Sequence, residues 1–204
     1  NYAWDDTVES VISAPDPFED GIVLDITSSD VTVEGFIIQS LHSTGSGGSG
    51  SDPHLVRVQA RYNPIDNVVV RNNVIGPNTN VTSQDGTKGR MGLYLAMPNY
   101  GDDSRDITNS LFTGNKIFDC KGNGNNIFVW GSAESYNPSA RGVLTGTVIE
   151  DNEIYGSHRS GIEIAGSADL LTIRDNAIYD NSGLSTDDPN KLKYGNGIVV
   201  IRMG

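Results

Sequence analysis

Cysteine, cationic residues and long apolar runs are all scarce in this chain, and each shortage excludes a class of protein. The one cysteine, Cys120, cannot form a disulfide within the chain, and we expect it to be a small buried apolar residue. Lys and Arg number 14 against 26 Asp and Glu, for a net charge of −12, whereas a nucleic-acid partner needs clustered cations. No apolar run approaches the about 18 residues that span a bilayer, so we predict no membrane span.

Glycine and asparagine are abundant instead. The 204 residues include 24 Gly and 19 Asn, and only 20% are charged, a usage that favours turns and strands over helices. The acidic surface is typical of an exported protein, of a protein with divalent-cation sites or of a salt-adapted protein, and equally of a surface that is merely solvated. We predict an extracellular or cell-surface location.

A short cassette recurs along the chain: an apolar residue, two polar or small residues, Asn, any residue, then Ile. Copies occupy residues 70–75, 112–117, 149–154 and 173–178, and a fifth at 33–38 has Phe36 in place of Asn. The final Ile residues lie 37, 42, 37 and 24 positions apart. Segments of approximately alternating polarity precede the copies at 21–26, 54–58, 92–95, 126–130 and 161–164, with a last one at 197–201. Each unit predicts a strand, a loop, a strand, a tight turn, a short strand and a long loop.

Such a unit cannot bury its apolar face alone, but stacked units bury a continuous column of Ile, Val and Leu and pair every strand with its neighbours. We therefore predict an all-β fold, a single-stranded right-handed parallel β-helix (solenoid) of about five coils with parts of two more. Residues 1–204 are expected to form one domain, a piece of a longer protein, because the chain begins without Met and stops directly after a strand-like segment. Residues 7–12 are expected to be the strand of a preceding coil.

The cassette asparagines are predicted to line up along the axis of the stack. Asn tolerates a left-handed backbone, and its side-chain amide can bond the equivalent Asn one coil away. This ladder explains the spacing without any chemistry, so we expect it to be structural. Its members are Asn73, Asn115, Asn152 and Asn176.

These cassettes resemble the parallel β-helix repeats of the pectate-lyase-like superfold, over about residues 21–201. The resemblance implies a groove along the first strand of each coil, walled by the long loops. It also implies a class of proteins that cleave, epimerise or merely bind polysaccharides. Function is therefore expected on the outer face of the first strands.

The alternation places one outward residue of each first strand in a row, with about 4.8 Å between coils. The row contains Asp25, Arg57, Tyr94, Phe128 with Trp130, Glu163 and Val199. Sugar rings stack on aromatic faces beside charged groups, so we predict that the substrate-binding residues are Asp25, Tyr94, Phe128 and Trp130. The alternative is that loops fold over the aromatic rings as a satellite core.

The tripeptide Asp52-Pro53-His54 is the first candidate catalytic group. It is similar to the Asp-Pro-His motif of mannuronan C5-epimerases, which share this fold and use the Asp and His with a Tyr and a Lys. The Tyr of that family lies three positions before its Asp, where this chain has Ser49, a far weaker acid. A group required for proton exchange at C5 is therefore absent from its expected place, and Tyr94 on the adjacent coil would substitute for it only by coincidence. The structural alternative is a Pro that ends a loop before a strand.

His158 and Arg159, shortly before Glu163, are the second candidate group. Lyases of this fold abstract the proton next to a uronate carboxyl with Lys, Arg, His or Tyr, while a cation or Ca²⁺ neutralises that carboxyl. Glycosidases instead need two carboxylates about 5 to 10 Å apart. The candidate carboxylate pairs are Asp25 with Asp52, and Glu163 with Asp187 or Asp188. The alternative for each charge is a solvated surface residue.

The predicted catalytic set is thus Asp52, His54, Arg57, His158, Arg159 and Glu163. No cofactor is required, although three oxygen-rich segments are compatible with Ca²⁺ without matching a recognised calcium loop. These are Asp102-Asp103-Ser104 with Asp106, Asp187-Asp188 with Asn190, and Ser83 with Asp85.

The expected function is that of a polysaccharide-active protein, acting as a lyase, glycoside hydrolase or epimerase on a glycan bound along the first strands. The alternative is a non-catalytic surface-layer, adhesin or filament component with the β-helix as a rigid scaffold, present as a homo-oligomer or an end-to-end stack.

Overall fold

Parallel strands and turns make up the whole part of the chain that the computed structural model describes, residues 10–13, 22–40, 54–78, 90–97, 105–120, 124–131, 142–166, 168–181 and 195–201. Every strand pairing is parallel and joins equivalent strands of successive units. Across these ranges no helix is long and apolar enough to cross a membrane.

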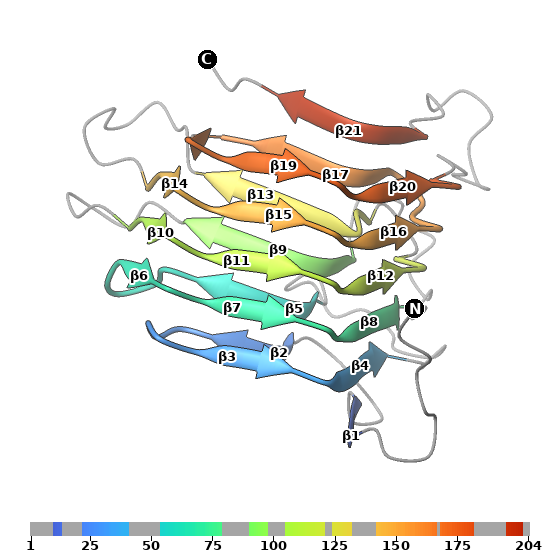
Figure 1. Cartoon of the computed structure of the whole chain (residues 1–204), viewed down its shortest axis with the longest axis horizontal. Helices are drawn as coiled ribbons and strands as arrows, with labels where there is room; N and C mark the ends of the chain where they lie inside the picture. Colours follow the sequence, from blue (N-terminus) through green and yellow to red (C-terminus); the bar gives the residue numbers. More distant parts are fainter. Residues whose placement is uncertain are drawn as a thin grey trace, which may run out of the picture.

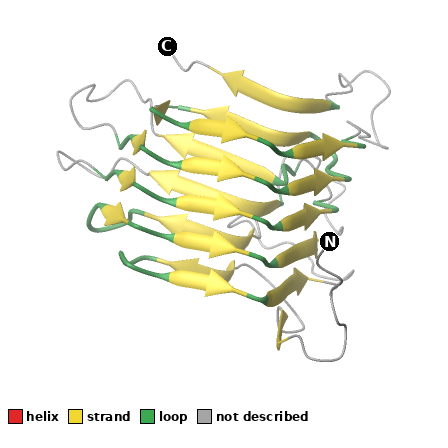
Figure 2. Ribbon diagram, viewed as in Figure 1, coloured by secondary structure: helices red, strands yellow, loops and turns green. Residues whose placement is uncertain are grey.

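Five coils follow one another, and each passes through three sheets in the same order, while coils 2 to 5 add a short strand of a fourth sheet (Figure 2). Coil 1 contains β2 (Ile22–Ile26), β3 (Thr32–Glu34) and β4 (Phe36–Ser40). Coil 2 contains β5 (His54–Gln59), β6 (Ile65–Asp66), β7 (Val69–Arg71) and β8 (Val74–Asn78). Coil 3 contains β9 (Met91–Met97), β10 (Ile107–Thr108), β11 (Leu111–Thr113) and β12 (Lys116–Phe118).

The last two full coils repeat this arrangement, and single strands flank the stack. Coil 4 contains β13 (Ile127–Gly131), β14 (Leu144–Thr145), β15 (Val148–Glu150) and β16 (Glu153–Tyr155). Coil 5 contains β17 (Ser160–Ala165), β18 (Ala168–Asp169), β19 (Thr172–Arg174) and β20 (Ala177–Tyr179). The flanking strands are β1 (Ser10–Ser13) and β21 (Asn196–Ile201). The predicted five coils with parts of two more are confirmed.

Four sheets run along the stack. The first-strand sheet is β2-β5-β9-β13-β17-β21, the second-strand sheet is β3-β7-β11-β15-β19 and the third-strand sheet is β1-β4-β8-β12-β16-β20. The fourth sheet, β6-β10-β14-β18, was not predicted. Its strands are two residues long, too short to show an alternating pattern in the sequence.

The stack is right-handed. In Figure 1 the second-strand sheet lies in front with its arrows pointing right, the first-strand sheet lies behind with its arrows pointing left, and successive coils rise from the N-terminal to the C-terminal end. A chain that turns in this sense while it rises traces a right-handed helix, as expected for parallel strands joined by crossovers.

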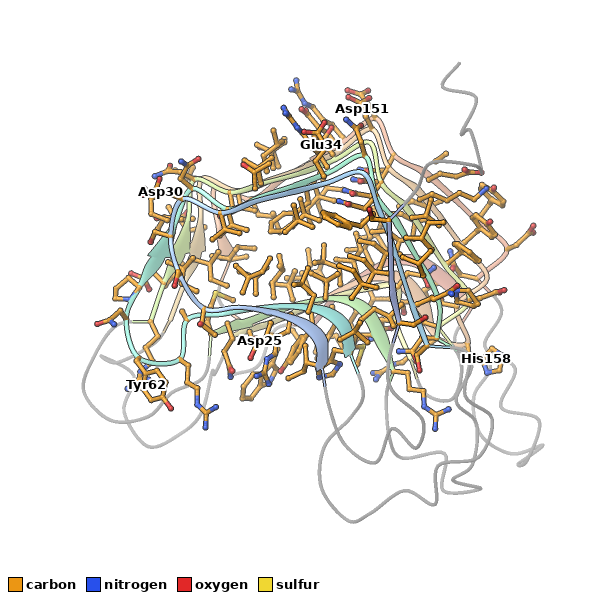
Figure 3. The ribbon with its side chains drawn as sticks, turned by 90° about the horizontal axis from the view of Figure 1, so that it is seen from below. Asp25, Asp30, Glu34, Tyr62, Asp151 and His158 are labelled. Atoms are coloured by element: carbon orange, nitrogen blue, oxygen red, sulfur yellow. The ribbon has the colours of Figure 1, made fainter. Side chains whose placement is uncertain are left out.

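Aliphatic side chains from the three main sheets fill the interior of each coil (Figure 3). The cassette isoleucines form one such column, because each pairs in register with the next. Ile38, Ile75, Ile117 and Ile154 are fully buried. Burial of an aliphatic side chain of this size stabilises the fold by about 1.5–3 kcal/mol, so the column is a main source of stability. Cys120 is fully buried, as predicted.

The predicted asparagine ladder is present. The side-chain oxygen of Asn115 accepts hydrogen bonds from the backbone N–H and the amide Nδ2 of Asn73, both at 3.1 Å. Asn152 accepts in the same way from Asn115, and Asn176 from Asn152, at 2.9–3.0 Å. Each amide nitrogen also donates to a backbone carbonyl of the preceding coil. The ladder therefore satisfies both the amides and the backbone at this corner.

One part of the prediction for this corner was wrong, because the ladder asparagines do not themselves adopt the left-handed backbone. The residue before each of them does so, with φ between 54° and 76° in all five coils: Gly35, Asn72, Gly114, Asp151 and Asp175. At Gly114 an added Cβ would lie 2.5 Å from Oδ1 of Asn72, so close stacking also requires glycine there. The left-handed residue makes the turn, and the next residue is thereby free to point its amide along the axis.

Candidate functional site

The outer face of the first-strand sheet carries the predicted row of side chains. The register pairs Asp25 with Arg57, Arg57 with Tyr94, Tyr94 with Phe128, Phe128 with Glu163 and Glu163 with Val199. The predicted outward row is therefore in register across all six strands. Inward neighbours such as Leu93, Ile127 and Ile162 are fully buried in the core.

A second outward row begins each first strand, and the sequence did not predict it. At Gly92 an added Cβ would lie 2.7 Å from Cγ2 of Ile117, so this position faces the interior, and its equivalent Leu55 is a core residue. Two successive positions therefore face inward where the strand begins. The residue before these two inward positions, such as His54 or Asn125, therefore lies on the outer side of the sheet, as the residues of the predicted row do. The second row is Ile22, His54, Met91, Asn125, Ser160 and Asn196.

His54 lies against Tyr94, which links the two rows. Their ring centroids are 4.4 Å apart with planes tilted by 52°, and the other neighbour of Tyr94, Phe128, stacks on it at 5.6 Å and 11°. Tyr94 thus has an aromatic ring on each side. A sugar ring cannot stack where a face is already occupied, so this contact favours a role for the phenol hydroxyl rather than for the ring face.

Arg57 is held in place by Asp25. Its Nε and a terminal nitrogen donate to the two carboxylate oxygens of Asp25 at 3.0 and 2.6 Å, a bidentate arrangement that fixes the guanidinium plane. The Arg57 side chain is 17% exposed, so one side remains accessible. Asp25 is thereby a positioning group for the cation as well as a candidate sugar ligand.

The His54 imidazole is neutral. Burial, with the nearby Arg57 charge in the same direction, lowers the pKa of His54 to about 3, although Asp25 acts in the opposite direction. The side chain is only 7% exposed, and its Nδ1 atom has no hydrogen-bond partner. A buried polar atom without a partner is costly, by about 1–3 kcal/mol. Nδ1 is therefore available to a ligand as a proton acceptor.

Glu163 and Arg159 form the second cluster. A terminal nitrogen of Arg159 lies 3.1 Å from Oε1 of Glu163, whose side chain is 3% exposed against 32% for the arginine. Burial raises the pKa of Glu163, and Arg159 and the side-chain amide of Asn125 lower it by less. Apart from this contact with each other, Oε2 of Glu163 and Nδ2 of the fully buried Asn125 have no hydrogen-bond partner. Asn125 is a candidate that sequence reasoning missed, because the predicted strand began one residue later, at Asn126.

One member of the predicted catalytic set, His158, does not join these clusters, and another, Asp52, lies outside the described residues. His158 lies at the corner between the third-strand and first-strand sheets, where its backbone N–H donates to the carbonyl of Cys120 at 3.0 Å and its side chain points outward (Figure 3). The ion pair with Glu163 is made by Arg159. Asp52 lies outside the described residues, as do Asp187 and Asp188, so the carboxylate pairs that involve them stay predictions.

Trp130 occupies a different environment from the other aromatic residues. It pairs in register with Ala96 on one side and Ala165 on the other, so its neighbours along the row are methyl groups. Its side chain is half-buried. Among the aromatic residues of this face, Trp130 therefore best suits the predicted sugar-stacking role. Two coils away in the same row lies Gln59, also missed by sequence reasoning, with an unpartnered buried Oε1.

Within the described ranges no group of three or more His, Cys, Asp and Glu side chains is arranged to hold a metal ion. Of the oxygen-rich segments that are compatible with Ca²⁺, only Asp106 belongs to these ranges, and its carboxylate accepts a hydrogen bond from the backbone N–H of Val143 at 2.8 Å. The calcium prediction therefore stays untested.

Comparison with protein-family models gives no match for this chain, and comparisons with curated proteins and with solved structures give none either. The parallel solenoid follows from the strand pairing, whereas any functional assignment depends on the chemistry of the outer face.

Proposed function

We propose that this chain binds an extended polysaccharide containing uronic acid along the outer face of the first-strand sheet, and that His54, Tyr94 and Arg57 transfer protons on it. The proposal includes the pectate-lyase-like resemblance and an extracellular or cell-surface location. The observation that carries it is the convergence of an unpartnered neutral imidazole, a phenol and a bidentately held guanidinium on adjacent coils of one face.

These three groups suit chemistry at the carbon next to a uronate carboxyl. Arg57 neutralises the carboxylate, which makes the adjacent C5 proton more acidic. Nδ1 of His54 accepts this proton, and the negative charge of the bound carboxylate raises the pKa of His54 towards the range of a general base. In a lyase the C5–H electron pair forms the C4–C5 double bond, the C4–O bond breaks and Tyr94 protonates the leaving oxygen. In an epimerase Tyr94 returns a proton to the opposite face of C5.

Among the described residues, the two carboxylates of the outward row are too far apart to act together as a glycosidase pair, whereas the predicted partners Asp52, Asp187 and Asp188 lie outside these residues. Asp25 and Glu163 are separated by four register steps, about 19 Å at 4.8 Å per coil, well beyond the about 10 Å that an inverting glycosidase tolerates. Asp25 is also engaged by Arg57.

The test measures exchange and cleavage together. Homopolymeric and alternating uronate polysaccharides are incubated with the protein in D₂O, and deuterium at C5 is followed by NMR while ultraviolet absorbance reports unsaturated products. His54→Gln and Tyr94→Phe are each expected to lower the rate by about 10²–10⁴-fold, the usual contribution of a general acid or base. The matched control is Arg174→Ala, on the second-strand sheet, which should leave the rate unchanged. Rates unaffected by both site substitutions, or no exchange on any polymer, would overturn the proposal.

A scaffold function is the second candidate, because apolar residues are uncovered at the C-terminal end of the stack. Ile198, Val200 and Ile201 of β21 are 48%, 72% and 38% exposed. Ile198 continues the inward-facing column of Ile127 and Ile162. A further coil or a second copy stacked there would bury them. Light scattering of the chain against concentration distinguishes this function, since end-to-end association raises the mean mass and an isolated chain does not.

A further inference from the structure

Arg61 differs from the other cations of the described residues, because no carboxylate pairs with it. The other Lys and Arg side chains of these residues that reach solvent each form an ion pair within the chain: Arg57, Arg71, Lys116, Arg159 and Arg174. The remaining two, Arg90 and Arg105, are at most 8% exposed. Arg61 is exposed, and its guanidinium lies over the ring of Tyr62, 5.3 Å from the centroid. In a chain with a net charge of −12, an exposed cation without a carboxylate is available to an anionic ligand.

Tyr62 is 71% exposed, which is unusual for an aromatic side chain away from the ends of this stack. The other exposed large apolar residues of the described ranges belong to β1, coil 5 or β21: Val11, Leu170, Tyr179, Ile198, Val200 and Ile201. Tyr62 belongs to coil 2, between β5 and β6, with a further coil on either side. Arg61 lies over one face of its ring, which leaves the other face for a ligand. A guanidinium beside an aromatic face suits a sugar acid, since the cation holds the carboxylate and the ring packs on the sugar C–H groups.

This pair lies on the side of the stack that carries the proposed uronate site. Figure 3 shows Tyr62 on the same side as Asp25, nearer the corner of the coil. Arg61 follows the end of β5, the strand that carries Arg57, and its backbone N–H donates to the carbonyl of Gln59 at 2.9 Å. At about 3.3 Å per residue, the four residues from Arg57 to Arg61 cover about 13 Å at most, roughly two to three linked sugar units. One glycan chain can therefore reach both cations.

Gln59 lies on β5 between the two arginines. Its side chain is 8% exposed, and its Oε1 atom has no hydrogen-bond partner. Its register partner on the next coil is Ala96, so only a methyl group stands beside it in that direction. An acceptor without a partner suits a sugar hydroxyl, which always carries a donor. The stretch between the two cations is therefore also equipped to contact a sugar.

We infer that Arg61 and Tyr62 form a second uronate subsite, and that the glycan crosses the stack along β5 to reach it. This inference rests on the proposed function. It specifies the substrate as a block of linked uronic acids, in which a second carboxylate follows the one at Arg57 within two to three units. A glycan that ran along the axis of the stack instead would pass from Arg57 to Tyr94 and Phe128 of the next coils and would not meet Arg61.

The experiment measures how binding depends on the length of the glycan. Oligogalacturonates and oligomannuronates, from the dimer to the hexamer, are titrated by calorimetry into the full chain carrying His54→Gln, which prevents turnover. In at least one series the affinity should rise by about three- to tenfold at the length that first reaches Arg61, as expected for an exposed ion pair with an aromatic contact. Adding Arg61→Gln or Tyr62→Ala should remove most of this gain and leave binding of the dimer unchanged. Tyr62→Phe, which keeps the ring, should retain it.

The matched control is Arg71→Gln, which removes the same charge from an exposed position of the second-strand sheet and should leave the gain in place. An equal loss in this variant would mean that net charge alone attracts the oligomers, and the subsite would be overturned. The subsite is also overturned if longer oligomers bind no better than the dimer, or if Arg61→Gln and Tyr62→Ala leave the gain unchanged. In these cases the proposed function stands on exchange at C5. Binding of no oligomer overturns both proposals.

Discussion

The asparagine corner and the outer face of the first-strand sheet both contain buried polar side chains, but the two regions differ in whether these side chains have hydrogen-bond partners. Asn73, Asn115 and Asn152 are at most 2% exposed, and their amides all bond within the ladder. His54 and Gln59 are at most 8% exposed, yet each has a polar atom without a partner. Burial alone therefore does not distinguish structure from function in this protein. The two regions differ in hydrogen-bond satisfaction, although buried side-chain atoms of Ser157 and Asn126, outside the proposed site, also have no partner.

The largest expected effect is at the corner. Asn115→Ala removes the acceptor for two donors of Asn73 and the donor to the carbonyl of Val70, and leaves them buried. At about 1–3 kcal/mol for each unsatisfied group, partly relieved by relaxation, we expect a loss of about 2–4 kcal/mol in the free energy of unfolding. Urea denaturation measures it. Asn176→Ala at the partly exposed end of the ladder is the matched control and should lose less. Equal losses would mean that the ladder contributes little.

The next effect is the pH dependence that His54 imposes. In the unfolded chain His54 takes up a proton near pH 6.5, whereas in the folded protein its pKa is about 3. Between these values the unfolded state binds more protons, so the free energy of unfolding falls as the pH falls from about 6.5 towards 3. In His54→Gln the free energy of unfolding should fall by about 1–3 kcal/mol less between pH 6.5 and pH 4, because one pKa unit corresponds to about 1.4 kcal/mol. Thermal unfolding at both pH values measures it, and an unchanged slope would show that His54 is solvated.

A smaller effect of opposite sign is expected from Glu163. Its pKa is raised by burial, so the folded state holds a proton that the unfolded state has already lost above pH 4.5. Its contribution to stability is present below that pH and is lost as the pH rises through the folded-state pKa. Glu163→Gln should remove this loss, so that the variant gains stability relative to the original chain on going from about pH 4 to pH 7. No relative gain would indicate that Arg159 and Asn125 outweigh burial.

The smallest effect is expected at the exposed ion pairs of the second-strand sheet. Arg71 and Glu34 lie 2.7 Å apart, but their side chains are 47% and 41% exposed. Solvent screens such a pair, so Arg71→Ala should leave the urea midpoint within experimental error of the original. A clear fall in the urea midpoint would mean that the exposed charges act as a network. The difference in stability contribution between these ion pairs and the asparagine corner would then be smaller than expected.

Most of the repeat was predictable from the sequence, whereas the finer geometry was not. The cassette isoleucines and asparagines have a fixed offset within each unit, so their alignment follows once units stack in register. The short fourth sheet and the left-handed residue before each ladder Asn left no such pattern, because two-residue strands and single turn residues carry no period. Asn125 was missed because its position depends on two successive inward residues at the start of the strand, which breaks the alternation.

The sequence by itself determined the coil number, the outward row from Asp25 to Glu163 and the asparagine ladder, since all three depend on local period and on repetition. Only the tertiary structure decided that His54 lies against Tyr94, that Arg159 rather than His158 pairs with Glu163, and which buried atoms lack partners. These contacts join residues of different rows or different coils, and side-chain direction and burial arise from stacking, which no single repeat contains.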